Sequence, residues 1–151
     1  MTRINFYEIP QDRDAAWRFC CRLAHKLGLQ QRRILIQVPS HEDAAQLSEL
    51  LWSLEPESFL PHALAAEQGE ESGENKPSAD ERVLLNWLDD PGDHHDVLIN
   101  LMPTTPTWFS RFEVVAELVY HEQRYLKMKR EVFQFYRQRG YPLDHHRLPP
   151  Q

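Results

Sequence analysis

Glycine is scarce in this chain, which has five glycines among its 151 residues. A dinucleotide site needs a glycine turn after the first strand, because only glycine lets the backbone approach the pyrophosphate closely. The corresponding turn here is Pro10-Gln11-Asp12-Arg13-Asp14, with no glycine and two acids. The sequence also lacks a GxxxxGK phosphate-binding loop. These absences argue against a nucleotide site.

Cysteine is scarcer still, because Cys20 and Cys21 are the two cysteines of the chain and lie side by side in a helical pattern. They are too few and too close for the disulfide framework of a secreted domain. We predict that one thiol is buried and the other partly exposed. No apolar run approaches the ~20 residues that cross a bilayer, and the first residues do not resemble a signal peptide. We therefore expect a cytoplasmic protein that does not bind membranes.

Histidine is more common, and two clusters raise the question of a metal site: His94-His95-Asp96 and Asp144-His145-His146. Neighbouring residues of an extended chain point to opposite faces, so each pair offers one metal ligand more readily than two. The sequence has no HExxH motif, no paired Cys/His zinc spacing and no GxSxG nucleophile motif. We expect exposed loop histidines, no metal, no cofactor and no catalytic residue.

A positive net charge is also missing, since the formal charge is −6. Proteins that bind DNA over a large surface are usually basic, because phosphate contacts dominate their affinity. The net charge therefore argues against direct DNA binding by the whole surface.

The hydrophobic pattern alternates between strands and helices. We predict strands over 4–9, 33–38, 82–87, 96–101 and 114–119, the last of the chain, helices over 15–29, from 40 onward and over 122–139, and a helical turn at 108–112. Gly28 and Gly140 are expected to end the first and last helices, and Ser40 to cap the second. The link between the strands at 82–87 and 96–101 is too short for a helical crossover, which predicts a mixed sheet. The fold class is α/β, with a mostly parallel sheet flanked by helices.

The acidic, polar segment Ala65–Glu81 interrupts this pattern and is predicted to be a mobile surface loop. Too little chain lies on either side for two independent cores. We therefore expect a single domain over 1–151.

Two features exceed what an ordinary globular chain requires. Trp52 and Phe59 lie near a helix end and a proline-bounded loop, where they are either core residues or a hydrophobic contact patch. The last helix is the most basic part of an acidic chain. Its charges form either a solvated face or a site for an acidic ligand.

A resemblance separates these alternatives. It rests on Phe6-Tyr7, Leu51-Trp52 with 57–62, the strand at 97–101, the segments 109–112 and 113–119, and Arg130, Tyr136 and Gly140-Tyr141. In their order and spacing these features are similar to the chi subunit family of bacterial DNA polymerase III. The match covers nearly the whole chain and is weakest over 65–81.

The resemblance implies a Rossmann-like domain without a nucleotide site. It also implies a non-catalytic adaptor that joins the clamp loader, through the psi subunit, to the acidic C-terminal tail of single-stranded DNA-binding protein, and meets DNA only indirectly. The alternative is a nucleotide-binding or enzymatic α/β domain. The family positions that face psi fall on Trp52 and Phe59, with Leu60 and Pro61 beside them.

For the acidic tail, the resemblance points to Arg130. A second basic position of the family falls on Leu126, and Lys127 or Arg124 is expected to replace it. The resemblance implies an acidic tail that ends in Phe, so its receptor needs a cation beside an apolar pocket. We expect Val119 and Phe133 to line that pocket.

Overall fold

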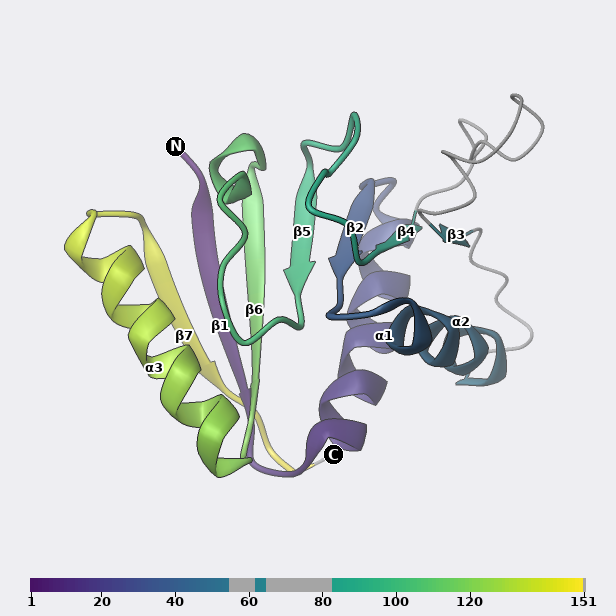
Figure 1. Ribbon diagram of the computed structural model, residues 1–151, viewed down its shortest axis with the longest axis horizontal. Helices are drawn as coiled ribbons and strands as arrows, with labels where there is room; N and C mark the ends of the chain where they lie inside the picture. The colour runs from purple at the N-terminus through teal and green to yellow at the C-terminus, as the bar shows by residue number, and fades with distance from the viewer. Residues whose placement is uncertain (55–61, 65–82, 151) are drawn as a thin grey trace.

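The structure, a computed structural model, describes residues 1–54, 62–64 and 83–150. The predicted loop at 65–81 lies outside them. Seven strands form one sheet in the order β3-β4-β2-β5-β6-β1-β7 (Figure 1). The strands are β1 Arg3–Ile9, β2 Ile34–Gln37, β3 His62–Leu64, β4 Val83–Asn86, β5 Val97–Asn100, β6 Val114–Tyr120 and β7 Leu143–Arg147. The helices are α1 Arg13–Leu29, α2 His41–Leu54 and α3 Gln123–Gln138, with a short 3-10 turn at Phe109–Arg111.

The α/β fold is confirmed, but the prediction of a mixed sheet is wrong. Every strand pairing in the described part of the chain is parallel. The link between β4 and β5 is too short for a helical crossover, but the two strands are not neighbours, since each pairs with β2. An extended link over 87–96 reaches about 30 Å at ~3.3 Å per residue. That length is enough to return along a short strand and cross two strand spacings of ~4.8 Å.

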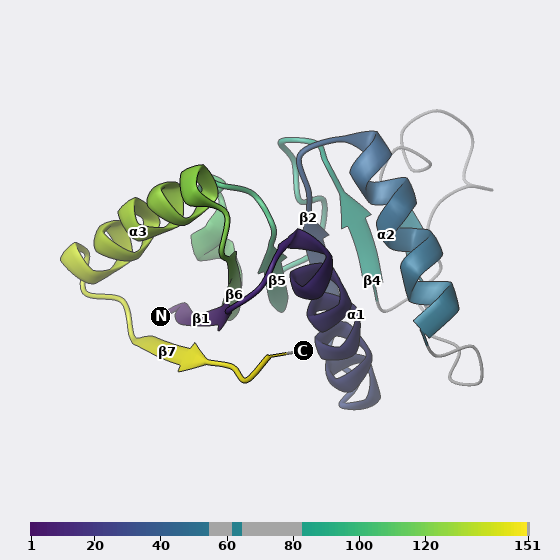
Figure 2. The same ribbon diagram turned by 90° about the horizontal axis from the view of Figure 1, so that it is seen from below.

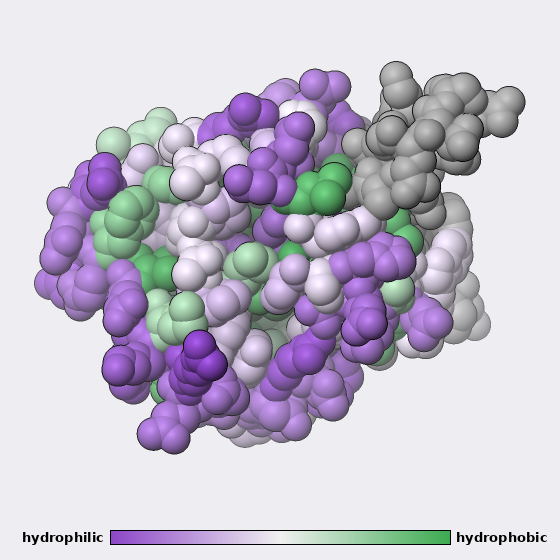
Figure 3. Space-filling view, in the orientation of Figure 1, coloured by the Kyte–Doolittle hydropathy of each residue, from purple (hydrophilic) through white to green (hydrophobic). Residues whose placement is uncertain are grey.

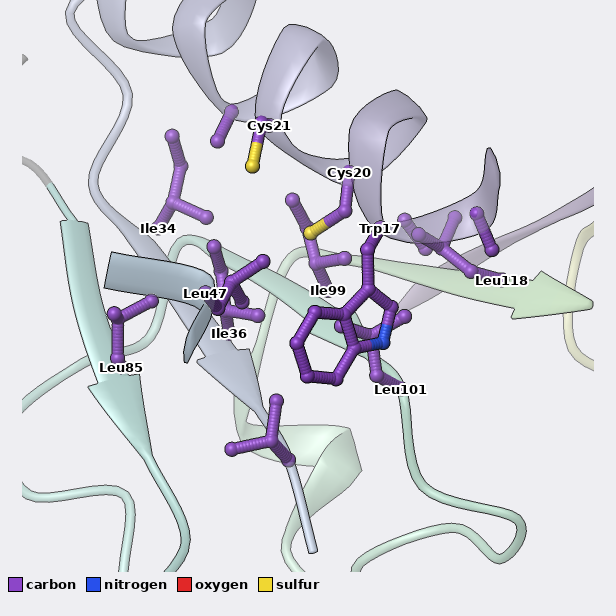
Figure 4. Close-up of a cluster of buried hydrophobic side chains, with 14 of the residues drawn as sticks. Trp17, Cys20, Cys21, Ile34, Ile36, Leu47, Leu85, Ile99, Leu101 and Leu118 are labelled. Atoms are coloured by element: carbon purple, nitrogen blue, oxygen red, sulfur yellow. The ribbon is translucent and has the colours of Figure 1, made fainter. Parts of the chain in front are cut away.

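Side chains alternate between the two faces of the sheet and form two cores. In β2, Ile34 and Ile36 belong to the core beneath α1 and α2, whereas Leu35 belongs to the core beneath α3. Figure 4 shows Ile34 and Ile36 beside Trp17, Cys20 and Cys21 of α1. The sheet is therefore covered by helices on both faces, as Figure 2 shows from below.

Both cysteines are buried in the first of these cores, so the prediction of one partly exposed thiol is wrong. Burial raises the pKa of Cys21 to about 12 and that of Cys20 well above its ordinary value. Neither thiol is therefore a thiolate near neutral pH, which fits a packing role.

Local capping explains where the helices begin and end. The Ser40 hydroxyl accepts from the Asp43 amide at the start of α2, as predicted, and the Asp12 carboxylate, which was not predicted as a cap, accepts from the Ala15 amide at the start of α1. Gly140, at φ 76°, follows the end of α3 as expected. Gly28 does not end α1, because the helix continues to Leu29 and the left-handed position is taken by Gln31 at φ 61°.

The last strand was not predicted from the sequence. β7 pairs in parallel with β1, so β6 is not the last strand of the chain. Its histidines are therefore strand residues and not loop residues: His145 Nε2 lies 3.0 Å from Glu8 Oε1, and the His146 ring stacks on Tyr7 at 4.9 Å between centroids. His94 departs from the prediction in another way, since it is only 5% exposed.

A buried polar network fixes α3 to the sheet. Lys129 Nζ lies 2.5 Å from Glu117 Oε1, and both side chains are inaccessible to solvent. Tyr136 donates to the other carboxylate oxygen at 2.7 Å, and the Asn100 amide donates to Oε1 at 2.9 Å. Burial lowers the pKa of Lys129, although the neighbouring carboxylate opposes that shift. Lys129 therefore adds no charge to the surface of this basic helix.

Candidate peptide-binding site

A cavity of about 410 Å³ opens between α3 and the β1–β7 end of the sheet. Its lining residues come from β1, β6, β7 and α3, and Figure 2 shows α3 over this end of the sheet. Its lining consists of Phe6, Glu8, Val119, His121, Leu126, Lys129, Arg130, Phe133, Gln134, His145 and Arg147. We call it the tail pocket.

The apolar part of the tail pocket is built from aromatic and branched side chains. Phe6 and Phe133 meet edge to face, with ring centroids 5.1 Å apart and planes at 71°. Val119, at 6% exposed, completes this part from β6. Phe6 and Val119 belong to the core beneath α3, so the pocket ends on well-packed side chains. Such a surface accepts an aromatic or aliphatic group from a ligand.

The rim of the tail pocket is basic. Arg130 is exposed, and within the described part of the chain its guanidinium makes no hydrogen bond or ion pair. Arg147, at the end of β7, lines the same cavity and is also exposed. A guanidinium that is not paired with a carboxylate of its own chain is available for two parallel hydrogen bonds to a ligand carboxylate.

The one acidic side chain of the lining, Glu8, is occupied by two histidines. Its Oε2 lies 3.0 Å from His121 Nε2, and its Oε1 lies 3.0 Å from His145 Nε2. Burial raises the pKa of Glu8, but the hydrogen bonds from the two histidines outweigh it and hold the pKa below its ordinary value. Glu8 therefore stays ionised near neutral pH while both of its oxygens face the histidines.

The structure brings together three of the five residues that we predicted for the acidic tail, namely Arg130, Val119 and Phe133. Lys127 does not line the tail pocket but lines an adjoining hollow, to which Arg130 also contributes. Arg124 lines neither hollow. Leu126 contributes apolar wall to the tail pocket, where the resemblance places a basic residue in the family.

Sequence reasoning missed Arg147, His145 and His121. The first two stand on the unpredicted strand β7, so nothing placed them next to α3. Arg147 supplies a cation at the rim of the same pocket, from the opposite wall to Arg130. The sequence signal for the two β7 residues was the short, mostly polar run that follows Pro142, which a pattern search does not distinguish from a loop.

The second predicted contact surface is described only in part. Trp52, in the last turn of α2, is 50% exposed, so it is not a core residue. Phe59, Leu60 and Pro61 lie outside the described residues. α2 packs against β3 and β4, at the opposite end of the sheet from β1 and β7, which line the tail pocket; Figure 1 shows α2 and β7 far apart.

A further cavity of about 620 Å³ lies on the other side of α3, against the 104–110 segment. Phe109, Phe135 and Tyr141 line it, together with Arg139, which lies over the Phe135 ring at 4.7 Å. Figure 3 shows hydrophobic atoms over the upper part of α3 with hydrophilic atoms around them.

None of the helices in the described residues combines the length and the apolar composition that a membrane span requires.

Solved structures with a similar fold include T4 UvsW, with a TM-score of 0.70, 8% identity, and coverage of 97% of this chain and 41% of that chain. The second domain of the DEAD-box helicase Mss116p, solved bound to an RNA duplex, gives a TM-score of 0.67 at 9% identity and covers 97% of this chain and 64% of that chain. At these identities the likeness concerns the fold alone.

Sequence comparison is more specific. DNA polymerase III subunit chi of Pseudomonas aeruginosa is 39% identical over 150 residues, which cover 99% of each chain. The Escherichia coli subunit chi is 27% identical and covers 95% of this chain and 97% of its own length. The family model of the DNA polymerase III chi subunit, HolC, matches residues 1–144. The chain therefore belongs to the DNA polymerase III chi subunit family and is an accessory subunit of DNA replication.

Proposed function

We propose that this subunit is a non-catalytic adaptor. In this proposal it binds the psi subunit, and through psi the clamp loader, with the surface around Trp52. With the tail pocket it binds the acidic C-terminal tail of single-stranded DNA-binding protein. It acts in the cytoplasm and contacts DNA only through these partners.

The observation that carries the proposal is the composition of the tail pocket. A tail that ends in acidic residues and Phe presents side-chain carboxylates, an α-carboxylate and one ring. The tail pocket offers exposed cations at Arg130 and Arg147 beside an apolar floor at Phe6, Val119 and Phe133. Each part of the ligand therefore has a complementary group in the pocket.

The position of Trp52 supports the second contact. Its half-exposed indole offers apolar area that a partner can bury, and such aromatic groups dominate binding energies at interfaces. α2 and α3 lie at opposite ends of the sheet, so two partners can bind without overlap (Figure 1). This arrangement suits a protein that links two others.

The start of α1 argues against the alternative of a nucleotide-binding domain. Asp12 occupies the helix N-terminus and accepts the Ala15 amide with its own carboxylate. In a nucleotide site the same amides would bind phosphate. A carboxylate at this place repels phosphate and has already taken one of the donors.

The test is a co-purification experiment with three components. The subunit is mixed with psi and with full-length single-stranded DNA-binding protein, or with that protein lacking its last ten residues. We expect one complex that contains all three proteins, and loss of only the binding protein when its tail is removed. Retention of the tail-deleted protein would show that the contact is made elsewhere.

A second measurement addresses catalysis. A ligand far above its Kd stabilises the native state and raises the melting temperature. We expect ATP, GTP and NAD at millimolar concentration to leave the melting temperature of this protein unchanged, because we expect none of them to bind. A clear upward shift, or hydrolysis of any of the three, would overturn the non-catalytic assignment.

A further inference from the structure

β7 is an edge strand that lies beside the tail pocket. Among the strands that the structure describes, it pairs with β1 on one side and has no neighbour on the other. Figure 2 shows β7 at the outside of the sheet, with α3 on one face of it. An edge of this kind presents a row of backbone N–H and C=O groups without strand partners.

The register identifies these outward groups. The Pro142 carbonyl accepts from Ile4, and the Leu148 amide donates to Glu8, so both of these residues direct their backbone groups toward β1. Along a parallel strand, alternate residues direct their N–H and C=O groups to opposite sides. The backbone groups of Leu143, His145 and Arg147 therefore face outward from the sheet.

Two arginines lie on the side of this edge that faces the pocket. Arg147 and Arg130 line the tail pocket, and the Glu8 carboxylate is held by His121 and His145. Charged side chains on a short edge strand discourage pairing with unrelated strands. Here they favour an incoming strand that carries carboxylates.

We propose that the acidic tail binds as an additional strand on the outer edge of β7, with its last residue in the tail pocket. This inference rests on the proposed function and specifies how the ligand is held. Backbone hydrogen bonds to Leu143, His145 and Arg147 supply affinity that does not depend on the tail's side chains. Arg130 and Arg147 then select carboxylates, and the apolar floor selects the terminal ring.

The added strand runs parallel to β7. Two of the residues that line the tail pocket, Glu8 and Arg147, stand at or near the carboxyl ends of β1 and β7. A parallel strand brings its own C-terminus to that end of the sheet. An antiparallel strand would place its terminal carboxylate near Leu143, which does not line the tail pocket.

Backbone methylation of a synthetic tail peptide tests strand pairing directly. A series of ten-residue peptides is made in which one amide at a time is N-methylated while every side chain is kept. We expect an alternating pattern, with a loss of about threefold or more at every second position, since each methyl removes one hydrogen bond. A uniform pattern along the peptide would overturn the proposal.

The protein side is tested at Arg147 with two variants. Arg147→Ala removes the guanidinium, and Arg147→Pro removes both the guanidinium and the outward N–H. Proline is tolerated on an edge strand at a position where the N–H of the residue that it replaces faces away from the sheet. We expect both variants to fold, and Arg147→Pro to bind the peptide about three- to tenfold more weakly than Arg147→Ala. Equal affinities of the two variants would contradict strand addition.

A nitroxide on the peptide's N-terminus tests direction. In the parallel arrangement it broadens the amide signals of residues near Leu143, whereas broadening centred on Leu148 would overturn that arrangement.

Sedimentation of the free protein tests whether a second copy of the chain pairs with this edge instead of the peptide. A dimer that dissociates in Arg147→Pro would show that the edge pairs with a second copy, and would overturn the proposal.

Arg130→Ala separates this inference from the proposed function. If Arg130→Ala binds the peptide as tightly as the wild type, the tail pocket is not the binding site and both proposals fail. If Arg130→Ala weakens binding while the methylation series is uniform, the site stands and strand addition fails.

Discussion

Arg130 and Lys127 are both exposed cations on α3, yet their surroundings differ. Arg130 lines the tail pocket, whereas Lys127 lines only the adjoining hollow. Hydrogen bonds to charged groups contribute ~1.5–3 kcal/mol. Arg130→Ala should therefore weaken binding of an acidic, Phe-terminated peptide about tenfold to a hundredfold, as measured by calorimetry.

Two comparisons make this prediction specific. Lys127→Ala should have a smaller effect that disappears in high salt, because its attraction acts at longer range. Arg137→Ala serves as the matched control, since Arg137 is an exposed cation of the same helix and does not line the tail pocket. A loss of affinity in Arg137→Ala equal to that in Arg130→Ala would indicate a general charge effect.

His94 is expected to make the fold sensitive to acid. Its side chain is buried, and its Nε2 has no hydrogen-bond partner among the described residues. Burial, with the nearby Arg33 charge, lowers the pKa of His94 to about 4. In the unfolded chain its pKa is about 6.5, so the unfolded chain binds the proton first as the pH falls. The free energy of unfolding is therefore unaffected by His94 above pH 6.5, and it decreases as the pH falls from 6.5 toward 4.

The full loss amounts to at most about 3.5 kcal/mol, at ~1.4 kcal/mol for each unit of the pKa difference between about 6.5 and about 4. Urea unfolding at pH 7 and at pH 5 measures the part that is lost between these two pH values. His94→Leu should lose less stability between these two pH values than the wild type does. His95→Leu is the control, because His95 is exposed beside it. An identical acid response in His94→Leu would contradict the assignment.

The sequence could not reveal which polar residues are buried. Lys129 stands among the basic residues of α3, and only the parallel placement of β6 beneath that helix brings Glu117 to its ammonium group. The burial of His94 likewise depends on how the 87–96 link folds back. Arg130 was found because the resemblance carried it, and Val119 and Phe133 were predicted as its neighbours on the adjacent strand and helix, since no spacing rule alone brings residues of β6 and α3 together.

Among the helices, α2 allows an internal comparison. Leu47 is fully buried, and Trp52, near the end of the same helix, is half exposed. We expect Trp52→Ala to change the free energy of unfolding by less than about 1 kcal/mol. It should weaken psi binding by ~2 kcal/mol or more, which is about thirtyfold. Thermal unfolding and calorimetry measure the two quantities.

The matched variant Leu47→Ala should show the reverse. A buried Leu→Ala change costs ~2–5 kcal/mol of stability, while the psi contact is expected to survive in the protein that remains folded. If Trp52→Ala instead unfolds the protein as Leu47→Ala does, the indole is part of the core and the contact surface lies elsewhere.

A hydrophobic sequence pattern identifies the buried strands but not the exposed one. β2, β4 and β5 are buried along their whole length and gave continuous apolar runs, so they were predicted correctly. β7 is exposed over Asp144–Arg147 and has no apolar pattern, so pairing with β1 is its only strand signal. Its pairing partner is far away in sequence, and a local pattern cannot report it.

At the scale of the whole molecule, the two proposed contact surfaces belong to different ends of the sheet and to different cores. α2 packs in one core, and α3 packs in the other. The two cores meet at the sheet, whose strands contribute side chains to both, and we expect neither ligand to distort it. We therefore expect the peptide to bind with the same affinity, within about twofold, whether or not psi is present.

Calorimetry with and without saturating psi measures this coupling, which must be equal in both directions at equilibrium. A tenfold difference between the peptide affinities with and without psi would mean that the two binding sites are energetically coupled.

The pairing of β1 with β7 places residue 4 against residue 143. On the ribosome, β1 emerges first, but its neighbours β6 and β7 follow only after more than a hundred residues have been made. The β2–β4–β5 half of the sheet can assemble during that delay, whereas β1 must wait with its apolar side chains uncovered. β1, the earliest of the described strands, is thus among the last to be paired on both sides, and a nascent chain arrested before residue 143 would lack both β7 and the pocket that β7 completes.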